Sequence, residues 1–399
     1  MLLAGDYVPR MNRVVLDVPD ELLLCNLEAP IIGDKQFFPS RKAGITLDTH
    51  ALTDGFQRKI FTLANNHIMD FGEDGLMETR AVLRREGFFA VGAGGCKEEA
   101  KMPLCFEEKG QRIAILGCCE RQFGVAENNK AGVCEMGLWM LPVIAELKKQ
   151  SNIVIVSCHA ALEFSPWPSP WLRSFYKSLI DSGADVIHGH HAHVPQGFET
   201  YRHGVIFYGL GNFVVDPVHW QRNPAYVWSA VVRLKFDNGR VIWKMDYCEV
   251  EKKTDGVIRV RLSEPDERRA HAQYMAAACR AFSDDDMCEA YWQEASLRFY
   301  HKLYAVPLGM TPVVGKRLTS RQRVRLAMNA ASKSMYALIG CEFPTKGSIK
   351  SACASYNFFN CLSHADAVST ALGVLLGERG DLRSVQTKMD ADVLHVGKI

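Results

Sequence analysis

Three histidines lie within four positions in the segment Gly189-His190-His191-Ala192-His193, directly after a β-rich run at 186–188. Each imidazole would need partners for its ring nitrogens if it were buried. In an extended segment His191 and His193 point to the same side, because side chains alternate along a strand. Two imidazoles on one side, next to a glycine that lets the backbone come close, suit a transition metal. The alternative is a histidine-rich turn at the surface.

Four further groups of polar residues follow predicted strands, and they offer oxygen as well as nitrogen ligands. Singly they are weak signals, since Gly5-Asp6 is a common turn and Glu28 could cap a helix. Together, carboxylate, amide and imidazole groups at separate strand ends favour a two-metal hydrolytic centre over a structural zinc site, which prefers cysteine. The four groups are Gly5-Asp6, Asn26-Leu27-Glu28, Asn65-Asn66-His67 with Asp70, and His159 with Glu163.

The elements that must position these groups alternate along the first two thirds of the chain. Short apolar runs predict buried strands, and the amphipathic stretches between them predict helices. This alternation indicates an α/β layered domain, in which sites form where the strands end. The predicted strands are 22–25, 60–63, 113–116, 153–157, 186–188 and 205–208, and the clearest helices are 75–86 and 141–149.

The chain changes character in its last third. Two long β-rich runs, 226–236 and 241–250, flank Asp237-Asn238-Gly239, which predicts a hairpin that closes the first domain. From Ser263 onward, where Glu264, Pro265 and Asp266 signal a helix start, the pattern is helical, with further helices expected at 284–304, 320–339 and 363–377. We therefore predict one domain over 1–255 and a helical region of unknown role over 263–399. The basic residues between Lys316 and Arg325 are expected to form a solvated helix face.

The composition is that of an ordinary globular chain of 399 residues, with 48% hydrophobic and 23% charged residues. The formal net charge of +2 gives no general argument for nucleic acid or an anionic membrane as partner. There are 13 cysteines without a CxxC pair, which favours buried thiols in a reducing compartment. A phosphate-binding loop is not indicated, because Gly92-Ala93-Gly94-Gly95 lacks the Lys and Ser/Thr that would follow.

The N-terminal residues have no basic region, long apolar stretch or cleavage site of a signal peptide. No later segment is long enough and free enough of charge to suggest a transmembrane helix. The chain as given is therefore expected to be cytoplasmic, although one trimmed of a leader would look the same.

The order of the motifs over about residues 1 to 250 resembles the bacterial capsule-synthesis (CapA, poly-γ-glutamate biosynthesis) family. This resemblance implies a calcineurin-like metallophosphatase fold, in which two mixed β-sheets are flanked by helices. It also implies a role in making, anchoring or trimming an anionic capsular polymer. The motifs are Gly5-Asp6, Asn26-Leu27-Glu28-Ala29-Pro30, the stretch from Leu63 through Asn65-Asn66-His67 to Gly72, Val91-Gly92-Ala93-Gly94, Gly189-His190-His191-Ala192-His193-Val194 and Tyr208-Gly209-Leu210-Gly211-Asn212-Phe213.

The resemblance also implies roles for particular residues around a divalent metal centre, expected to hold two ions of Mn, Fe, Zn or Mg. His67 would donate a proton, and Asp70 could orient it. The metal ligands would be Asp6, Glu28, Asn66, His159, His191 and His193, and substrate would be bound by Glu163, Trp167, Trp171, His190 and Asn212.

Two departures and two alternatives accompany these roles. Metallophosphatases usually begin with Asp-x-His, whereas Asp6 is followed here by Tyr7-Val8. The family also often has His-Trp-Gly-x-Glu, where this chain has His159-Ala160-Ala161-Leu162-Glu163. The Pro-rich stretch 164–171 could stack its aromatic rings on substrate or pack them on the domain. Asn212 and Asp216 could contact substrate or form Asx turns.

We expect a metal-dependent hydrolase or transferase that acts on a phosphoester or a γ-glutamyl amide in a capsular or other cell-surface polymer. Its substrate would be an anionic polymer or a small phosphorylated compound. The alternative is a non-catalytic, metal-stabilised accessory subunit whose helical region docks polymer-synthase proteins. Hydrolysis of nucleic acid is disfavoured by the near-neutral charge.

Overall fold

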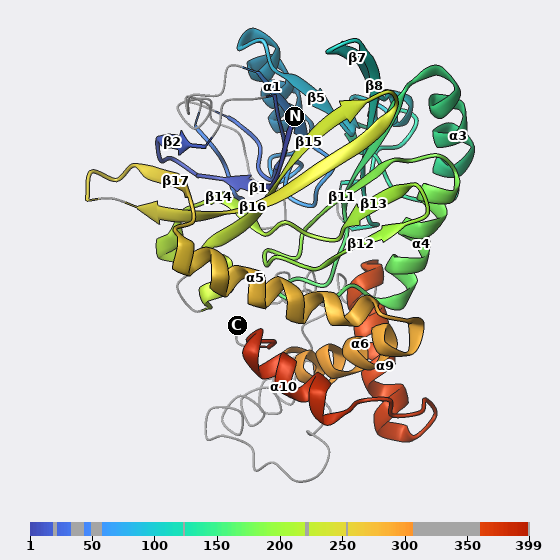
Figure 1. The fold of residues 1–399 in the computed structure, drawn as a ribbon. Helices are drawn as coiled ribbons and strands as arrows, with labels where there is room; N and C mark the ends of the chain where they lie inside the picture. Colours follow the sequence, from blue (N-terminus) through green and yellow to red (C-terminus); the bar gives the residue numbers. More distant parts are fainter. Residues whose placement is uncertain are drawn as a thin grey trace, which may run out of the picture.

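The computed structural model describes residues 1–18, 22–32, 44–48, 58–122, 124–219, 223–252, 254–305 and 360–397. Two mixed β-sheets form its centre (Figure 1). The predicted helix at 320–339 and the basic segment 316–325 lie outside the described residues.

The first sheet has nine strands in the order β2-β17-β16-β15-β1-β3-β4-β5, with β14 also paired to β1. Strands β1, β3, β4 and β5 run parallel, and β15 joins β1 antiparallel. The predicted hairpin is confirmed, and both turn residues, Asn238 and Gly239, have the positive φ that a tight hairpin turn requires. The strands are β1 (Leu2–Val8), β2 (Val14–Asp17), β3 (Leu23–Leu27), β4 (Lys59–Thr62), β5 (Phe89–Val91), β14 (Asn212–Val215), β15 (Trp228–Asp237), β16 (Arg240–Lys252) and β17 (Ile258–Leu262).

The second sheet has six strands in the order β12-β13-β11-β10-β8-β7. Its central strands β8, β10, β11 and β13 are parallel, so their carboxyl ends meet at one edge. A separate two-stranded ladder joins β6 and β9. The strands are β6 (Ala93–Gly94), β7 (Leu104–Glu108), β8 (Gln111–Cys119), β9 (Gly132–Val133), β10 (Ile153–His159), β11 (Val186–His190), β12 (Phe198–Tyr201) and β13 (Gly204–Phe207).

Alternation along the strands divides the core into layers. On β8, Ile113 and Ile115 point between the two sheets, whereas Ala114 and Leu116 point to the helices on the outer face. Leu24 of the first sheet packs in the same inter-sheet layer. Truncating a side chain such as Ile115 to Ala should cost about 2–5 kcal/mol, because the surrounding layers cannot fully close the cavity. The expected fold class, two mixed sheets flanked by helices with a helical C-terminal region, is confirmed.

Helix α1 covers the outer face of the first sheet, and α3 and α4 cover that of the second. Ser169 caps α4 by accepting a hydrogen bond from the Leu172 amide, and Pro170 occupies the first turn. The helices of this part are α1 (Gly72–Arg85), α2 (Lys97–Ala100), α3 (Met140–Gln150) and α4 (Pro170–Asp181), with 3₁₀ turns at Pro217–His219 and Pro224–Tyr226.

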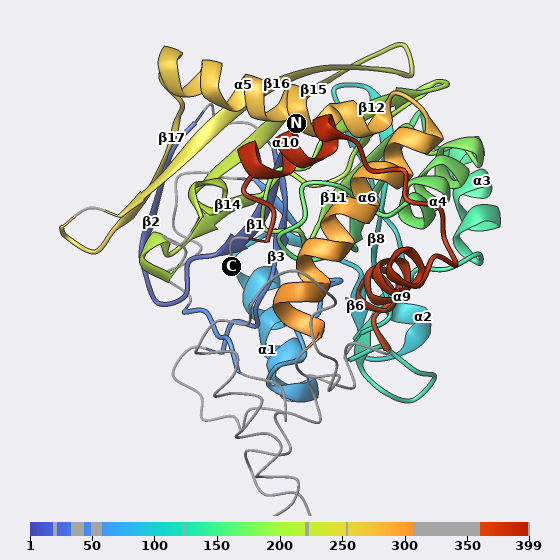
Figure 2. The same cartoon turned by 90° about the horizontal axis from the view of Figure 1, so that it is seen from below.

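The C-terminal helices group at one end of the sandwich, beside α4 (Figures 1 and 2). The helices expected at 284–304 and 363–377 are confirmed. Strand β17, between the two predicted domain ranges, pairs with β16 and β2 in the first sheet. The division into a domain and a helical region stays a prediction. The elements are α5 (Pro265–Cys279), a 3₁₀ turn (Arg280–Phe282), α6 (Asp285–Phe299), a π-helical turn (Tyr300–Tyr304), α9 (Leu362–Leu376) and α10 (Val385–Val393).

In the described parts of the chain, every helix is too short or too polar to cross a membrane. The cysteines in the same parts are free thiols, and most of them are buried.

Candidate metal centre

The candidate ligands come from the carboxyl ends of strands in both sheets. In the first sheet, strand register sets Asp6 of β1 beside Asn26 of β3 on one side and Asn212 of β14 on the other. In the second sheet, His159 at the end of β10 lies beside His190 at the end of β11. The remaining candidates follow their strands directly: Glu28 after β3, Asn66 after β4, and His191 and His193 after β11.

Two glycines explain how the strand ends come so close. A Cβ on Gly5 would lie 1.8 Å from the Gly211 carbonyl oxygen, and a Cβ on Gly189 would lie 2.0 Å from that of Tyr208. No side chain fits either place, so the Gly-Asp and Gly-His motifs are set by backbone packing as well as by chemistry.

Six acidic and imidazole side chains form three overlapping groups, each with its ligand atoms within 4.8 Å of one another. Glu28, His191 and His193 each belong to two groups, and Glu28, as a carboxylate with two oxygens, could bridge two neighbouring ions. The groups contain five of the six predicted ligands, together with Glu163, which was expected to bind substrate. The groups are Asp6–Glu28–His193, Glu28–His159–His191 and Glu163–His191–His193.

Two asparagines, Asn26 and Asn66, lie beside His159, and Asn26 also connects it to Asp6. The sixth predicted ligand, Asn66, has its Oδ1 3.2 Å from His159 Nε2. Asn26 Nδ2 donates to Asp6 Oδ1 at 2.8 Å and lies 3.2 Å from His159 Nδ1. Asn65 in turn donates to Asn26 Oδ1 at 3.0 Å. Sequence reasoning did not select Asn26 or Asn65, although both stand in the motifs that it used.

The segment after β11 is not extended as expected, yet His191 and His193 still converge in one group with Glu163. Both residues have positive φ, 85° for His191 and 56° for His193, which costs a non-glycine residue about 1–2 kcal/mol. Their rings lie 6.1 Å apart at 67°. In this turned backbone His193 lies 3.4 Å from Asp6 and 3.6 Å from Glu28, and His191 Nε2 lies 2.8 Å from Gln122 Nε2.

The electrostatics of the cluster follow from burying carboxylates among imidazoles. Burial opposes ionisation of Asp6, but hydrogen bonds from His190 and His193 outweigh it and hold the Asp6 pKa well below its usual value. Burial also opposes charging of His193, yet Glu28 and Asp6 raise its pKa to about 10. Burial lowers the pKa values of His159 and His191. Acidic groups that attract positive charge, beside neutral imidazoles, are a donor set that fits a divalent cation.

His67 differs from the buried histidines. Its Nδ1 lies 2.8 Å from Asp70 Oδ2, and the same oxygen accepts from the Ile45 amide at 3.0 Å. Asn65 Oδ1 accepts from the amides of His67 and Ile68, which fixes the turn that carries the imidazole. The predicted orientation of His67 by Asp70 is thus present in the geometry.

Two residues expected to bind substrate instead hold candidate ligands. His190 is buried, with Nε2 3.1 Å from Ser157 Oγ and Nδ1 3.4 Å from Asp6. Asn212 Oδ1 lies 3.0 Å from His193 Nδ1, while its Nδ2 donates to the Tyr226 carbonyl. His190 is therefore placed to orient Asp6, and Asn212 is placed to orient His193.

The remaining three substrate candidates lie in different surroundings. Trp167 is completely buried and packs on Tyr291 of α6 with ring centroids 4.7 Å apart. Of the two roles left open for it, packing is therefore the one that the structure has, and stacking on substrate is wrong. Trp171 stacks on Phe175 and is 46% exposed. Glu163 is about one third exposed, 3.9 Å from His191, at the open side of the cluster.

Glu120 and Gln122, at the end of β8, are site neighbours that sequence reasoning missed. Glu120 Oε1 lies 3.9 Å from His191 Nε2, and its Oε2 accepts from the amide and hydroxyl of Ser363 at the start of α9. Burial raises the Glu120 pKa to about 7, against the hydrogen bonds from Ser363 and Ala161. No motif marks these residues, and the contact joins positions more than 240 residues apart.

Comparison with known proteins adds relatives for the part of the chain that carries the cluster. The PGA biosynthesis protein CapA of Bacillus subtilis (strain 168) is 32% identical over 203 residues, which are 48% of this chain and 52% of that protein. The capsule biosynthesis protein CapA of Bacillus anthracis is 34% identical over 232 residues, 54% of this chain and 55% of that protein. The chain thus spans about half the length of the curated relatives it matches.

A solved phosphatase of Mycoplasma pneumoniae covers 66% of this chain and 94% of its own, with 14% identity and a TM-score of 0.37. A structural match with so low a TM-score adds nothing to the assignment of this chain to a family. The profile of the bacterial capsule synthesis protein PGA_cap family matches residues 6–217, which is more than half of the chain and includes every candidate ligand. This chain therefore belongs to the bacterial capsule synthesis protein PGA_cap family.

Proposed function

We propose that the chain is a metal-dependent hydrolase or transferase of the metallophosphatase type that makes or processes a capsular or other cell-surface polymer. The observation that carries this proposal is the set of three overlapping groups of buried carboxylates and imidazoles, whose ligand atoms lie within 4.8 Å. Buried carboxylates are costly without positive charge nearby, and Asp6 and Glu28 are buried close enough to His193 to raise its pKa to about 10, so the site attracts positive charge.

The donor set fits one or two divalent ions better than it fits zinc in a structural role, because it mixes oxygen and nitrogen and contains no thiolate. Asp6, Glu28, Asn66, His159, His191 and His193 would hold them, with Glu163 as a further carboxylate at the rim. A bound divalent ion there would activate water and stabilise negative charge on the reacting phosphoryl or acyl centre.

His67 would protonate the leaving group, and its exposure supports this role. Its side chain is 17% exposed, whereas those of His159 and His191 are at most 1% and that of His193 is 9% exposed. Asp70, 2.8 Å away, would hold the ring in one orientation.

Support for a polymer as substrate comes from the names of the relatives, which describe PGA and capsule biosynthesis. A phosphoester and a γ-glutamyl amide are both compatible with activated water beside a general acid. The helical region would dock polymer-synthase proteins, and no nucleic acid is expected as a partner.

The second candidate is a metal-stabilised accessory subunit without catalysis. The departure at the first motif favours it, because Val8 stands where Asp-x-His would place a ligand and Tyr7 is buried against Phe61.

Elemental analysis of the purified full chain, beside a screen with phosphomonoesters, phosphodiesters and γ-glutamyl oligomers in Mn²⁺, Fe²⁺, Zn²⁺ and Mg²⁺, separates the two candidates. We expect bound metal and turnover on one substrate class, both abolished in His191→Ala. Bound metal without turnover on any substrate would support the accessory subunit, and a chain that binds no metal would contradict both.

A further inference from the structure

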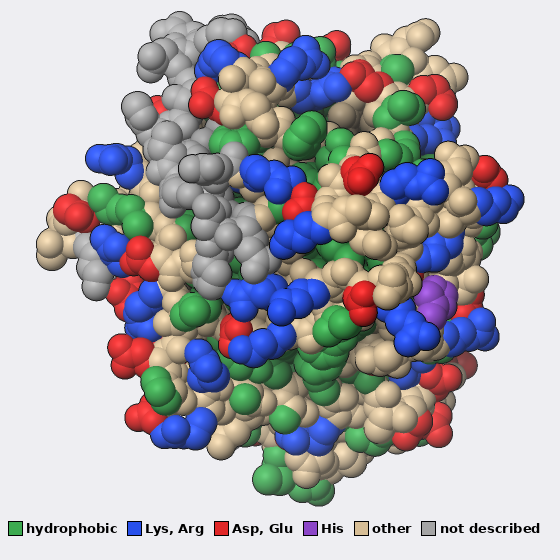
Figure 3. All heavy atoms as spheres, turned by 45° about the horizontal axis from the view of Figure 1, so that its top comes forward, with side chains coloured by type: hydrophobic (Ala, Val, Ile, Leu, Met, Phe, Trp, Pro, Cys, Tyr) green, Lys and Arg blue, Asp and Glu red, His purple; other side chains and the backbone are tan. Residues whose placement is uncertain are grey.

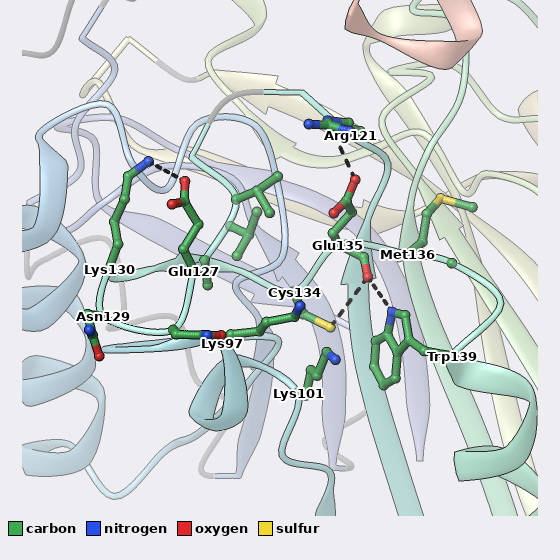
Figure 4. A pocket seen from close by; sticks show the side chains of 15 residues that line it. Lys97, Lys101, Arg121, Glu127, Asn129, Lys130, Cys134, Glu135, Met136 and Trp139 are labelled. Atoms are coloured by element: carbon green, nitrogen blue, oxygen red, sulfur yellow. Dashed lines mark hydrogen bonds and ion pairs between the residues drawn. The ribbon is translucent and has the colours of Figure 1, made fainter.

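A pocket outside the candidate ligand set lies at the end of β8, where Arg121 lines it. It has a volume of about 920 Å³, and its other lining residues are Lys97 of α2, Lys101, Trp139 and residues within 125–137 (Figure 4). We call it the basic pocket, after its four basic residues Lys97, Lys101, Arg121 and Lys130.

The walls of the basic pocket are held by backbone contacts. The β6–β9 ladder pairs Ala93 with Val133, and the Lys97 amide donates to the Glu127 carbonyl at 2.9 Å. A Cβ on Gly132 would lie 2.2 Å from the Gly124 carbonyl oxygen, so the loop closes on itself at a glycine. The pocket is therefore formed in advance of any ligand.

The charges of the basic pocket are unbalanced. Its two acids each pair with one base: Glu127 with Lys130 at 3.0 Å, and Glu135 with Arg121 at 3.7 Å (Figure 4). Within the described residues, Lys97 and Lys101 have no carboxylate partner, and Lys101 Nζ lies 4.3 Å above the Trp139 ring. On the face shown in Figure 3, by contrast, basic and acidic side chains are interspersed.

Arg121 connects the basic pocket to the metal centre. It stands between Glu120 and Gln122, whose side chains lie 3.9 and 2.8 Å from His191 Nε2. Its own side chain is 65% exposed and its ion pair with Glu135 is long, so little energy opposes turning it to a ligand. The stretch 120–122 thus contributes to both sites: Glu120 and Gln122 lie near His191, and Arg121 lines the pocket.

We propose that the basic pocket binds carboxylate groups of a polyanionic chain whose reacting bond lies in the metal centre. The proposal rests on the proposed function and adds a subsite to it. Lysine and arginine at the rim supply the charge, and a pocket of this volume admits several residues of a linear polymer. Lys101 lies over the ring of Trp139, which is the aromatic residue among the lining residues, whereas binding of single-stranded nucleic acid uses several aromatic rings that stack on successive bases.

The test measures binding of a fluorescent γ-linked glutamate decamer to the EDTA-treated full chain in low salt. We expect Lys97→Gln/Lys101→Gln to weaken binding about tenfold or more and to reduce its salt dependence, because two charge contacts are lost. The matched control is Lys149→Gln/Lys244→Gln, which removes two exposed lysines outside the pocket and should stay within about twofold of the wild type. Circular dichroism checks that each variant is folded.

The outcomes separate the pocket from the proposed function. Wild type that binds the decamer but hydrolyses nothing would contradict the proposed function alone. The pocket proposal is overturned if wild type does not bind the decamer, if the control variant loses as much affinity, or if polyphosphate of equal length binds and the decamer does not.

Discussion

At the residue scale, exposure and partners give the histidines of the cluster different roles. His159, His191 and His193 are buried among carboxylates, whereas His67 is partly exposed and paired with Asp70. Side chains that hold an ion and a side chain that moves a proton should respond differently to substitution, since only the former contribute to metal affinity.

Replacing His67 by Gln should keep most of the bound metal and lower turnover by about a hundredfold to ten-thousandfold, the range typical of general acid–base catalysis. The loss should be smaller for substrates with good leaving groups, because these need less protonation. Elemental analysis and rates on two leaving groups measure both effects.

The matched variant is His191→Ala, which should lose metal and turnover together because His191 belongs to two of the three ligand groups. If His67→Gln loses metal as completely as His191→Ala, then His67 is a ligand and its assignment as proton donor is wrong.

At the element scale, α9 is attached to the sheet that carries the histidines. Glu120, at the end of β8, accepts from the Ser363 amide at 3.1 Å and from its hydroxyl at 2.9 Å, inside a buried environment. A carboxylate from one element thus satisfies the first turn of a helix from another.

Replacing Ser363 by Ala should lower the free energy of unfolding by about 1–3 kcal/mol, since it removes a hydrogen bond to a buried carboxylate. Urea denaturation of the full chain measures the change. Ser283→Ala is the control, because its exposed hydroxyl bonds only within its own turn, and it should change stability by less than about 0.5 kcal/mol. Equal losses in the two variants would contradict the role given to Glu120.

Helix α10 is attached through Asp390, which gives its docking a pH dependence. Burial opposes ionisation of Asp390, but hydrogen bonds from Arg280, Tyr291 and Gln386 outweigh it, so its pKa is below the ordinary 3.8. Because the folded pKa is the lower one, its stabilisation is present above the unfolded pKa and is lost as pH falls through the folded pKa. The protection factors of α10 amides, which compare their exchange rates with those of an unstructured chain at the same pH, should therefore fall below about pH 4.

Asp390→Asn tests this directly. Its α10 amides should have lower protection factors than those of the wild type at neutral pH and should lose less further protection in acid, because the titrating group is gone. An unchanged acid response in Asp390→Asn would assign that response to other carboxylates.

At the scale of the whole molecule, the candidate ligands join two sheets that pack through one inter-sheet core. The first sheet supplies Asp6 and, just after their strands, Glu28 and Asn66, and the second supplies His159, His191 and His193. An ion bound between them would bind only the folded chain.

Saturating Mn²⁺ should therefore raise the melting temperature of the full chain by several degrees, since an excess of a hundredfold over Kd is worth about 2.7 kcal/mol. EDTA should reverse the shift. His191→Ala should melt at the same temperature with and without the ion, whereas Asp390→Asn, altered far from the cluster in sequence, should keep the shift. A shift retained by His191→Ala would place the ion elsewhere.

The sequence alone determined the layered α/β class, the hairpin at 226–250, the late helices and the segments that meet at the strand ends. These features depend on local periodicity and on turn residues such as Asn238-Gly239, which act within a few positions. The polar motifs could be located for the same reason, because residues directly after buried strands lie at one edge, whereas the ligands among them were chosen by the resemblance to the family.

Only the tertiary structure decided the arrangement inside the cluster. His191 and His193 both have positive φ, which local preference disfavours for histidine. Trp167 is buried because α6, more than 110 residues later in the chain, covers it with Tyr291. Glu120 reaches His191 on one side and Ser363 on the other through contacts that no local pattern encodes. Such contacts join residues that are far apart in the sequence. They depend on how the elements pack in the folded chain, which local sequence patterns do not reveal.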